Sequence, residues 1–359
     1  MSGARDWRSS GDIAVLGTGH ALPGPAIGTD ALFDRVVPHA PRLMRRQVAA
    51  VARQLAIETR HISRDFARRA EQPRPGARNP ELAALALTRA LEVAGLASND
   101  LGYIIGHTAT PAQPLPANIA LVADLIKYAG PHLELRQACT GFANALMIAF
   151  GLLAGPAARP IAIVGSETGS LFFDPAAAAD DPAQRVNLLQ MGDGAGAIIL
   201  GPAGSSAHRL HSAWFGATGL GLVPGLEMRE GGSDCPCPAA ASGPLRFVQD
   251  YAAIARSGPA LFDAAVAAAG GQGLSLHDAD WIVPHQTSGR IGAQAATRFS
   301  LPLDRIFVNA DRIGNTGSAA IWIALSMLRT ERMVAGQTAI ILGAEATKYM
   351  HGGFAYAHG

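Results

Sequence analysis

Short apolar runs that alternate with helix-length segments are the feature that most restricts the fold of this sequence. The runs suit buried strands and lie at residues 13–17, 103–105, 133–135, 161–164, 195–200, 281–283 and 339–342. Segments with helical periodicity or composition lie between them, at 42–70, 80–95, 116–128, 140–154, 245–269, 287–299 and 317–334. Strands that alternate with helices of this length predict α/β layers around a mostly parallel sheet.

The second half of the chain repeats the order of elements found in the first half, although the two halves share little sequence identity. The pattern breaks near 201–210, at GPAGSSA. We therefore expect two similar halves, one over residues 1–205 and the other over 206–359, which agrees with the length of the chain.

Composition excludes several classes of function. Hydrophobic residues make up 49% of the chain and charged residues 16%, so a large core can form. The net charge is +1 without a long basic run, which argues against a nucleic-acid-binding surface. Three cysteines do not make a disulfide framework, and the opening MSGARDWRSSGD lacks an apolar signal core. With no apolar run near 20 residues, we expect a cytoplasmic protein that does not enter the membrane.

Cys139 is the first candidate for chemistry, within LELRQACTGFANALMIAF. A strand ends near Arg136, the chain turns, and an apolar helix begins after the cysteine. The positive end of a helix dipole favours thiolate over thiol, and the first helical amides can bind an oxyanion. Such a turn suits covalent acyl transfer. The alternative is a buried structural cysteine.

Two further polar residues stand in comparable places. His285 follows the strand ending at Pro284, although a lone histidine is more often a surface or core residue. Asn315 lies between Gly314 and Gly317 just before an apolar helix, where its alternative role is that of an N-cap. Its amide can donate to a carbonyl without losing a proton.

The segments ACTGF, VPHQ, IGNTGSA and MGDGAGAIIL occur in an order that resembles ketoacyl-ACP synthase III and its relatives in the thiolase superfamily. The resemblance spans nearly the whole chain. It implies a thiolase fold with two duplicated βαβαβ-type halves in a five-layered α-β-α-β-α arrangement. It also implies a C–C bond-forming acyltransferase of fatty acid or polyketide biosynthesis.

The resemblance gives each candidate residue a role. Cys139 would take an acyl group from a thioester, and His285 and Asn315 would hold the carbonyl of a malonyl-type thioester during decarboxylative Claisen condensation. The amide of Cys139 and the closing glycine stretch with Gly353 would form a second oxyanion hole. A wall of the acyl cavity would contain Gly192, Gly194 and Gly196. Those glycines could equally serve a tight turn before a buried strand.

Two departures from the family pattern suggest a specialised, secondary-metabolic relative. Residues 42–59 contain no tryptophan, where primary-metabolism members stack one on the adenine of coenzyme A. This leaves an acyl carrier protein plausible as donor of both substrates. The segment before the closing Gly-Gly is also several residues longer than the usual glycine loop.

Partners and cofactors follow from the same resemblance. We expect acyl carrier protein or coenzyme A thioesters as partners, with Arg246 and Arg256 as candidate docking residues. We also expect a homodimer whose interface approaches residues 110–116. No metal or organic cofactor is implied, and CPC at 235–237 offers too few ligands for a metal.

Two other functions stay open from the sequence. An acyltransferase on the same scaffold would pass the acyl group from Cys139 to a hydroxyl or amine. A non-catalytic subunit would support an active paralogue in a heterodimer, although an intact set of Cys139, His285 and Asn315 argues against this.

Overall fold

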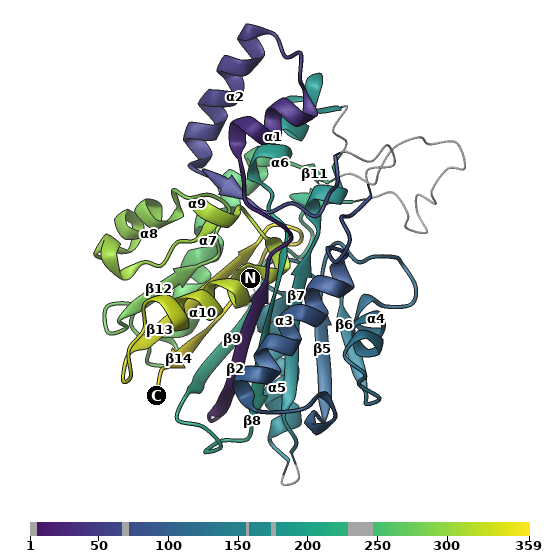
Figure 1. The fold of residues 1–359 in the computed structure, drawn as a ribbon. Helices are drawn as coiled ribbons and strands as arrows, with labels where there is room; N and C mark the ends of the chain where they lie inside the picture. The colour runs from purple at the N-terminus through teal and green to yellow at the C-terminus, as the bar shows by residue number, and fades with distance from the viewer. Residues whose placement is uncertain (1–5, 67–71, 156–157, 174–176, 229–246) are drawn as a thin grey trace.

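Ten strands form one large sheet in the centre of the protein, in a computed structural model that describes residues 6–66, 72–155, 158–173, 177–228 and 247–359 (Figure 1). The strand order is β12-β13-β14-β9-β2-β8-β7-β5-β6, and β1 pairs with β9. The bounds are β1 Trp7–Arg8, β2 Ile13–Ala21, β5 Tyr103–His107, β6 His132–Leu135, β7 Ile161–Glu167, β8 Gly194–Gly201, β9 Arg209–Ala217, β12 Trp281–Pro284, β13 Thr338–Glu345 and β14 Met350–Ala357. Two short pairings lie outside it, β3 (Ile27–Gly28) with β4 (Thr59–Arg60) and β10 (Leu226–Glu227) with β11 (Val248–Gln249).

The sheet consists of two wings with the same pattern of directions. From β2, the first wing runs antiparallel to β8, antiparallel to β7, then parallel to β5 and β6. From β9, the second wing runs antiparallel to β14, antiparallel to β13, then parallel to β12. The wings join where the first residues of β2 pair with the first residues of β9. The boundary expected at 205/206 falls between β8 and β9, and a division into two domains there stays a prediction.

Helices cover both faces of each wing. Because side chains alternate along a strand, Ile105 and Ile341 pack against the central helices α5 and α10, while Ile104 faces α3 and α4 and Ile340 faces α7 and α8. In Figure 1, α3 and α4 accordingly lie on the opposite side of the molecule from α7 and α8. The resulting layers confirm the predicted thiolase-type α/β fold. The expectation of a mostly parallel sheet is wrong, because β12–β13, β7–β5 and β5–β6 are parallel pairs while the other pairings of the sheet are antiparallel. The helices are α1 Thr29–Val36, α2 Arg42–Leu55, α3 Asn79–Ala94, α4 Asn118–Leu125, α5 Gly141–Leu153, α6 Pro182–Gln190, α7 Tyr251–Gly270, α8 Ile291–Phe299, α9 Ala310–Ile313 and α10 Ala320–Glu331.

Most expected elements are present, and the differences have local causes. Each expected strand coincides with part of β2, β5, β6, β7, β8, β12 or β13. The helix expected over 42–70 ends at Leu55, because Ala56 turns into the left-handed region at φ 51° and Ile57 is buried. Strands β9 and β14 were not expected. Among the described helices, none combines the length and the apolar character needed to cross a bilayer.

Candidate active site

Cys139 lies in the turn between β6 and α5, directly before Thr140, the N-cap of α5. The backbone amide and the hydroxyl of Thr140 both donate to Oε2 of Glu345, each at 2.7 Å. Glu345 is the last residue of β13, and its other oxygen accepts from the hydroxyl of Thr347. The carboxylate therefore fixes the start of α5, and with it the candidate nucleophile, to the turn between β13 and β14.

The expectation that Cys139 favours the thiolate is wrong. The residue as a whole is partly exposed, but its thiol is withdrawn from water, and this burial raises the pKa well above its usual range. The charges of Glu345 and Glu167 raise the pKa further, while a hydrogen bond from the backbone of Cys139 itself lowers it. Burial and two carboxylates outweigh the helix dipole, so the resting residue is a thiol.

Replacing Glu345 by glutamine should make Cys139 more reactive toward alkylation. Glutamine keeps an acceptor for Thr140 but removes the charge, so the pKa of the thiol falls and the thiolate fraction at pH 8 rises. Iodoacetamide labelling across a pH series would show a several-fold faster reaction of the variant at pH 8. An unchanged pH profile of labelling would mean that the charge of Glu345 does not affect the pKa of the Cys139 thiol.

His285 follows β12 and is positioned by the neighbouring strand, because its backbone amide donates to the carbonyl of Leu342 at 2.7 Å. The residue is only 3% exposed, and neither ring nitrogen has a hydrogen-bond partner among the described residues. Burial lowers its pKa to about 4. The imidazole is therefore neutral near pH 7, with both nitrogens available to a bound molecule.

Asn315 lies between α9 and the short 3-10 helix η5 (Gly317–Ala319). Its backbone amide donates to the carbonyl of Gln190 at 2.9 Å, and its carbonyl accepts from the amide of Gly192 at 3.0 Å. Its side-chain Oδ1 accepts from the amide of Gly317 at 3.1 Å, which closes an Asx-type turn. The alternative role as an N-cap is wrong, because Thr316 is the N-cap of η5 and Ala319 that of α10. The turn uses the oxygen, and the Nδ2 group makes no hydrogen bond with the described part of the chain.

Hydrogen bonds between neighbouring residues tie the three candidate segments together. Ser318, three residues after Asn315, places its hydroxyl 3.1 Å from the carbonyl oxygen of Gln137, two residues before Cys139. Gln190, which accepts from Asn315, donates through Nε2 to the carbonyl of Thr287 at 3.0 Å, two residues after His285. The structure therefore brings together the segments that carry Cys139, His285 and Asn315.

Three buried polar residues of this region were not singled out from the sequence, namely Glu167, Glu345 and His107. The carboxylate of Glu167 accepts from the amide of Ala109 at 3.0 Å and also bonds the hydroxyls of Thr110 and Ser318. Burial raises its pKa. Each of the three is the last residue of a buried strand, which is the signal that marked His285. A search of the sequence for polar residues at the ends of apolar strands would therefore have identified Glu167, Glu345 and His107.

His107 lies beneath the start of α5, where its ring would touch any side chain at Gly141. Trp322 donates through Nε1 to Nε2 of His107 at 2.9 Å, and burial lowers the pKa of His107 to about 3. The folded histidine therefore stays neutral at pH 5, whereas an unfolded one with a pKa of 6.5 binds a proton. Because the unfolded state then binds more protons, this residue lowers stability as the pH falls below 6.5.

We expect this effect to be measurable in a His107→Gln variant. Between pH 7 and pH 5, the wild type should lose about 2 kcal/mol of unfolding free energy through His107 alone. The variant, whatever its absolute stability, should lose about 2 kcal/mol less over the same interval. Urea titrations of both proteins at the two pH values would measure this, and equal losses would contradict the assignment.

The predicted glycines have identifiable places. A side chain at Gly192 would collide with the carbonyl of Ile313, and one at Gly196 would collide with Trp322 of α10. Gly194 likewise packs against Ile323. These residues let β8 and the preceding turn approach α10 and the Asn315 segment closely, and a role in lining the acyl cavity stays a prediction.

Gly353 does not lie in a loop. It is in the middle of β14, opposite Leu342 on one side and Trp214 on the other, so its backbone belongs to the sheet. The long closing segment contains a strand in place of the expected glycine loop. The two residues that flank the turn at 346–349 bond the neighbours of Cys139, because Glu345 accepts from Thr140 and the sulfur of Met350 accepts from Nε2 of Gln137 at 3.5 Å.

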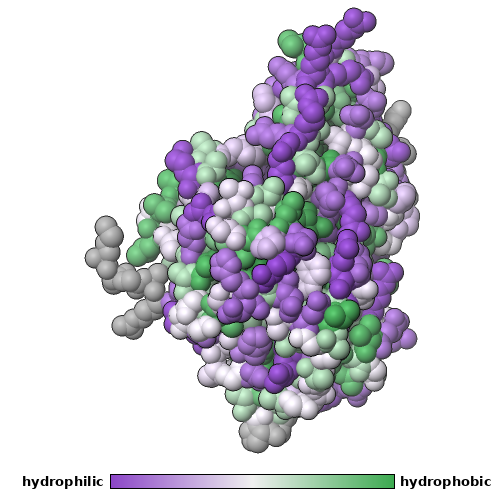
Figure 2. Space-filling view, turned by 90° about the vertical axis from the view of Figure 1, so that its left-hand side faces the viewer, coloured by the Kyte–Doolittle hydropathy of each residue, from purple (hydrophilic) through white to green (hydrophobic). Residues whose placement is uncertain are grey.

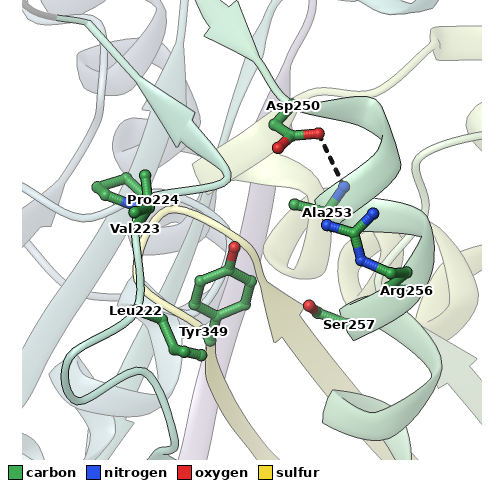
Figure 3. Close-up of a pocket in the computed structure, with 8 residues that line it drawn as sticks. All are labelled: Leu222, Val223, Pro224, Asp250, Ala253, Arg256, Ser257 and Tyr349. Carbon is green, nitrogen blue, oxygen red and sulfur yellow. Dashed lines mark hydrogen bonds between the residues drawn. The ribbon is translucent and has the colours of Figure 1, made fainter.

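A pocket of about 310 Å³ lies beside this turn (Figure 3). Tyr349 stands between the loop at 222–224 and helix α7, from which Arg256 points into the pocket. A carrier-docking role for Arg256 stays a prediction. Arg246 and the CPC segment lie outside the described residues. Within the described ranges, no group of three or more His, Cys, Asp or Glu residues is arranged to hold a metal ion.

Sequence comparisons match the chain to one family. The model for 3-oxoacyl-[acyl-carrier-protein (ACP)] synthase III matches residues 133–219, and the model for its C-terminal part matches 270–354. A β-ketoacyl-[acyl-carrier-protein] synthase III of Sphingopyxis alaskensis is 31% identical, over 96% of this chain and 97% of its own. The chain belongs to this family.

Solved structures agree with the synthase III assignment. A structure titled "AbyA1 - tetronic acid condensing enzyme" has a TM-score of 0.82 and 29% identity, over 96% of this chain and 99% of its own. The 3-oxoacyl-(acyl carrier protein) synthase III of Pseudomonas aeruginosa PAO1 has a TM-score of 0.77 and 25% identity, over 97% and 98%.

The predicted family and reaction class are therefore confirmed. As a synthase III, the protein is an enzyme of the acyltransferase type that forms C–C bonds by condensing acyl thioesters. The relatives do not favour transfer to a hydroxyl or amine, nor a purely supporting subunit.

Proposed function

We propose that Cys139 is the acyl-accepting nucleophile and that His285 and Asn315 are the donors that stabilise the enolate of a malonyl-type thioester. One observation carries this assignment. The neutral ring of His285 and the Nδ2 group of Asn315 have no partner within the described structure, and their segments are tied to that of Cys139. A buried imidazole without a partner is costly unless a ligand completes it, and the partly exposed Asn315 keeps its Nδ2 group free to donate to the same ligand.

In the first half-reaction, the sulfur of Cys139 attacks the carbonyl carbon of an acyl thioester. A new S–C bond forms, the C–S bond of the donor breaks, and the proton of the Cys139 thiol passes to the departing thiol. Since the pKa of Cys139 is raised, this proton needs an acceptor, and the neutral imidazole of His285 is the candidate. The amide of Cys139 and an amide of the turn at 346–349 would stabilise the oxyanion, in place of Gly353.

In the second half-reaction, a malonyl-type thioester loses carbon dioxide, and the electron pair of the broken C–C bond moves to the thioester oxygen. The N–H groups of His285 and Asn315 hydrogen-bond this developing enolate. Its carbon then attacks the acyl group, the new C–C bond forms, and the thiolate of Cys139 leaves. A neutral histidine suits this role, because it can donate a hydrogen bond without having been protonated by the solvent.

The thioesters would be delivered by acyl carrier protein or by coenzyme A. The absence of tryptophan from 42–59 supports a carrier protein, and the likeness to a tetronic acid condensing enzyme supports a specialised biosynthetic role. A cytoplasmic location belongs to the same proposal, because carrier-bound and coenzyme A thioesters are cytoplasmic metabolites. Recovery of the protein in the membrane or secreted fraction of its native cells would contradict that part.

A homodimer also belongs to the proposal. β6 is the end strand of the sheet, so one of its edges is open among the described residues. Leu115, in the segment expected at the interface, is 85% exposed. We expect sedimentation equilibrium to give about twice the chain mass of 37.1 kDa and Leu115→Glu to shift the protein toward the monomer. Leu220→Glu is the matched control, because Leu220 is 99% exposed on a different loop. A wild type that sediments as a monomer would contradict the dimer.

The function is tested by reconstitution with the wild-type enzyme. Acyl-CoA and acyl-carrier thioesters are offered in turn, and the protein is weighed intact by mass spectrometry. Malonyl thioester is then added to each acylated sample. The proposal expects a mass gain equal to one acyl group, followed by loss of that gain and appearance of a β-ketoacyl thioester. Release of the acyl group without a C–C product would refute condensation.

A further inference from the structure

Helix α2 carries a stripe of arginines that the condensation mechanism does not use. Arg42, Arg46 and Arg53 are spaced i, i+4 and i+11, which at 3.6 residues per turn places them on one face of the helix. All three are exposed. The opposite face, with Val48, packs against α1 and α6, and further apolar members of this contact are Met44, Val51 and Leu55. We call Arg42, Arg46 and Arg53 the arginine stripe.

The charges of the arginine stripe are unpaired within the described part of the protein. None of the three side chains forms an ion pair or hydrogen bond there, whereas the neighbouring Arg45 pairs with Asp34. No acidic residue stands in the first turn of α2, where the helix dipole would favour one, and Arg42 stands there instead. The like charges of Arg42 and Arg46 also repel at i, i+4 spacing. Arg53 stands in the last turn, where the helix dipole favours a positive charge, so helix stability accounts for Arg53 but not for Arg42 and Arg46.

The C-terminal end of α2 rests on the segments that follow His285 and precede Asn315. The carbonyl of Leu55 accepts from the amide of Gly289 at 2.9 Å, and the carbonyl of Arg53 accepts from Nη2 of Arg290, also at 2.9 Å. Just beyond the helix, the amide of Glu58 donates to the carbonyl of Asp311 at 2.7 Å. The stripe thus starts beside the catalytic segments.

From Arg53 at the C-terminal end of α2, the arginine stripe continues to Arg42 at the other end of the helix. A helix of this length extends about 20 Å. Figure 1 shows α2 at the upper end of the molecule above α9, and Figure 2 shows this end as largely hydrophilic. A partner that lies along α2 would have one end beside the segments that follow His285 and precede Asn315.

The positive charge of the arginine stripe favours a partner with an acidic surface. The chain as a whole has a net charge of only +1, so the stripe is a local feature that can attract and orient an acidic surface. A carrier protein that presents carboxylates along a helix and holds its acyl group on a long flexible arm would satisfy both the charge and the geometry. We propose that the arginine stripe of α2 is the docking surface for an acidic acyl carrier protein, an inference that rests on the proposed function.

The test compares two substrates that carry the same malonyl group, one bound to acyl carrier protein and the other to pantetheine alone. In a variant with R42E, R46E and R53E, kcat/KM for the carrier-bound substrate should fall by about 10-fold to 100-fold and lose its dependence on salt. For the pantetheine thioester it should stay within about 2-fold of wild type. This second substrate also reports whether the variant is folded. A wild type inactive with both substrates would be a failure of the proposed function itself.

Control variants make the result specific to the stripe. R42K, R46K and R53K together keep the charge and should leave carrier-dependent activity near that of wild type. R332E changes an exposed arginine just after α10 and should have no effect. Equal loss with both substrates would overturn the proposal, because it would show damage to the site. So would an unchanged carrier-dependent rate in the triple variant, or a loss found only in R256E, which would move docking to α7.

Discussion

The Cys139→Ala variant should take up no acyl group from any thioester donor and should form no condensation product. Without the sulfur there is no covalent intermediate, and no other described cysteine is free to replace it. Because a chemical step is removed and not merely slowed, we expect condensation to fall by at least about 10⁴-fold. Intact-protein mass spectrometry measures the uptake, and chromatography of the thioester products measures the condensation.

The same variant separates the two half-reactions. His285 and Asn315 are untouched, so the variant should still release carbon dioxide from a malonyl thioester, because the enolate is stabilised by those donors and not by the sulfur. Thermal unfolding controls for the fold, because the substitution removes a sulfur that is withdrawn from water. An acyl adduct on the alanine variant would place the nucleophile elsewhere in the chain.

The three candidate residues could be proposed from the sequence because each signal is local. A polar or reactive side chain that follows a short strand is visible in a few neighbouring residues, as at His285 after the buried β12 and at Cys139 after β6, which is only partly buried. Their electrostatics could not be predicted in this way. The carboxylate of Glu345 contacts Thr140 from 205 residues away, and its charge contributes to reversing the expected effect of the helix dipole on Cys139. Long-range contacts of this kind leave no trace in sequence spacing.

The layers of the fold were predictable for a similar reason, and the errors lie where the sequence pattern is ambiguous. The apolar runs of β7 and β13 are short and bounded, so they indicate strands directly. β14 begins with MHGGF, in which two glycines suggest a loop. In the folded protein, Gly352 and Gly353 lie against Ala143 and Trp214, where side chains would not fit. These two glycines allow β14 to pack closely against its neighbours, and this role can be recognised only in the tertiary structure.

Replacing either enolate donor should impair the second half-reaction and spare the first. In Asn315→Ala the Nδ2 donor is lost, and in His285→Ala both ring nitrogens are lost. A preorganised donor contributes about 3–4 kcal/mol to the transition state, so decarboxylation should slow by about 10²- to 10³-fold in each variant. Stopped-flow measurement of carbon dioxide release on the acylated enzyme gives this rate directly.

The rate of Cys139 acylation distinguishes Asn315→Ala from His285→Ala. It also shows whether either variant is misfolded. Asn315→Ala should acylate Cys139 at nearly the wild-type rate, because the amide has no part in proton transfer. His285→Ala should acylate more slowly, since the neutral imidazole is the proposed acceptor of the thiol proton, and the deficit should shrink as rising pH deprotonates the thiol. Asn315→Asp is the sharpest control, because it keeps the Oδ1 acceptor for Gly317 but replaces the donor by a negative charge. If Asn315→Asp decarboxylated malonyl thioester as fast as wild type, Asn315 would only stabilise the turn before η5 and would not be an enolate donor.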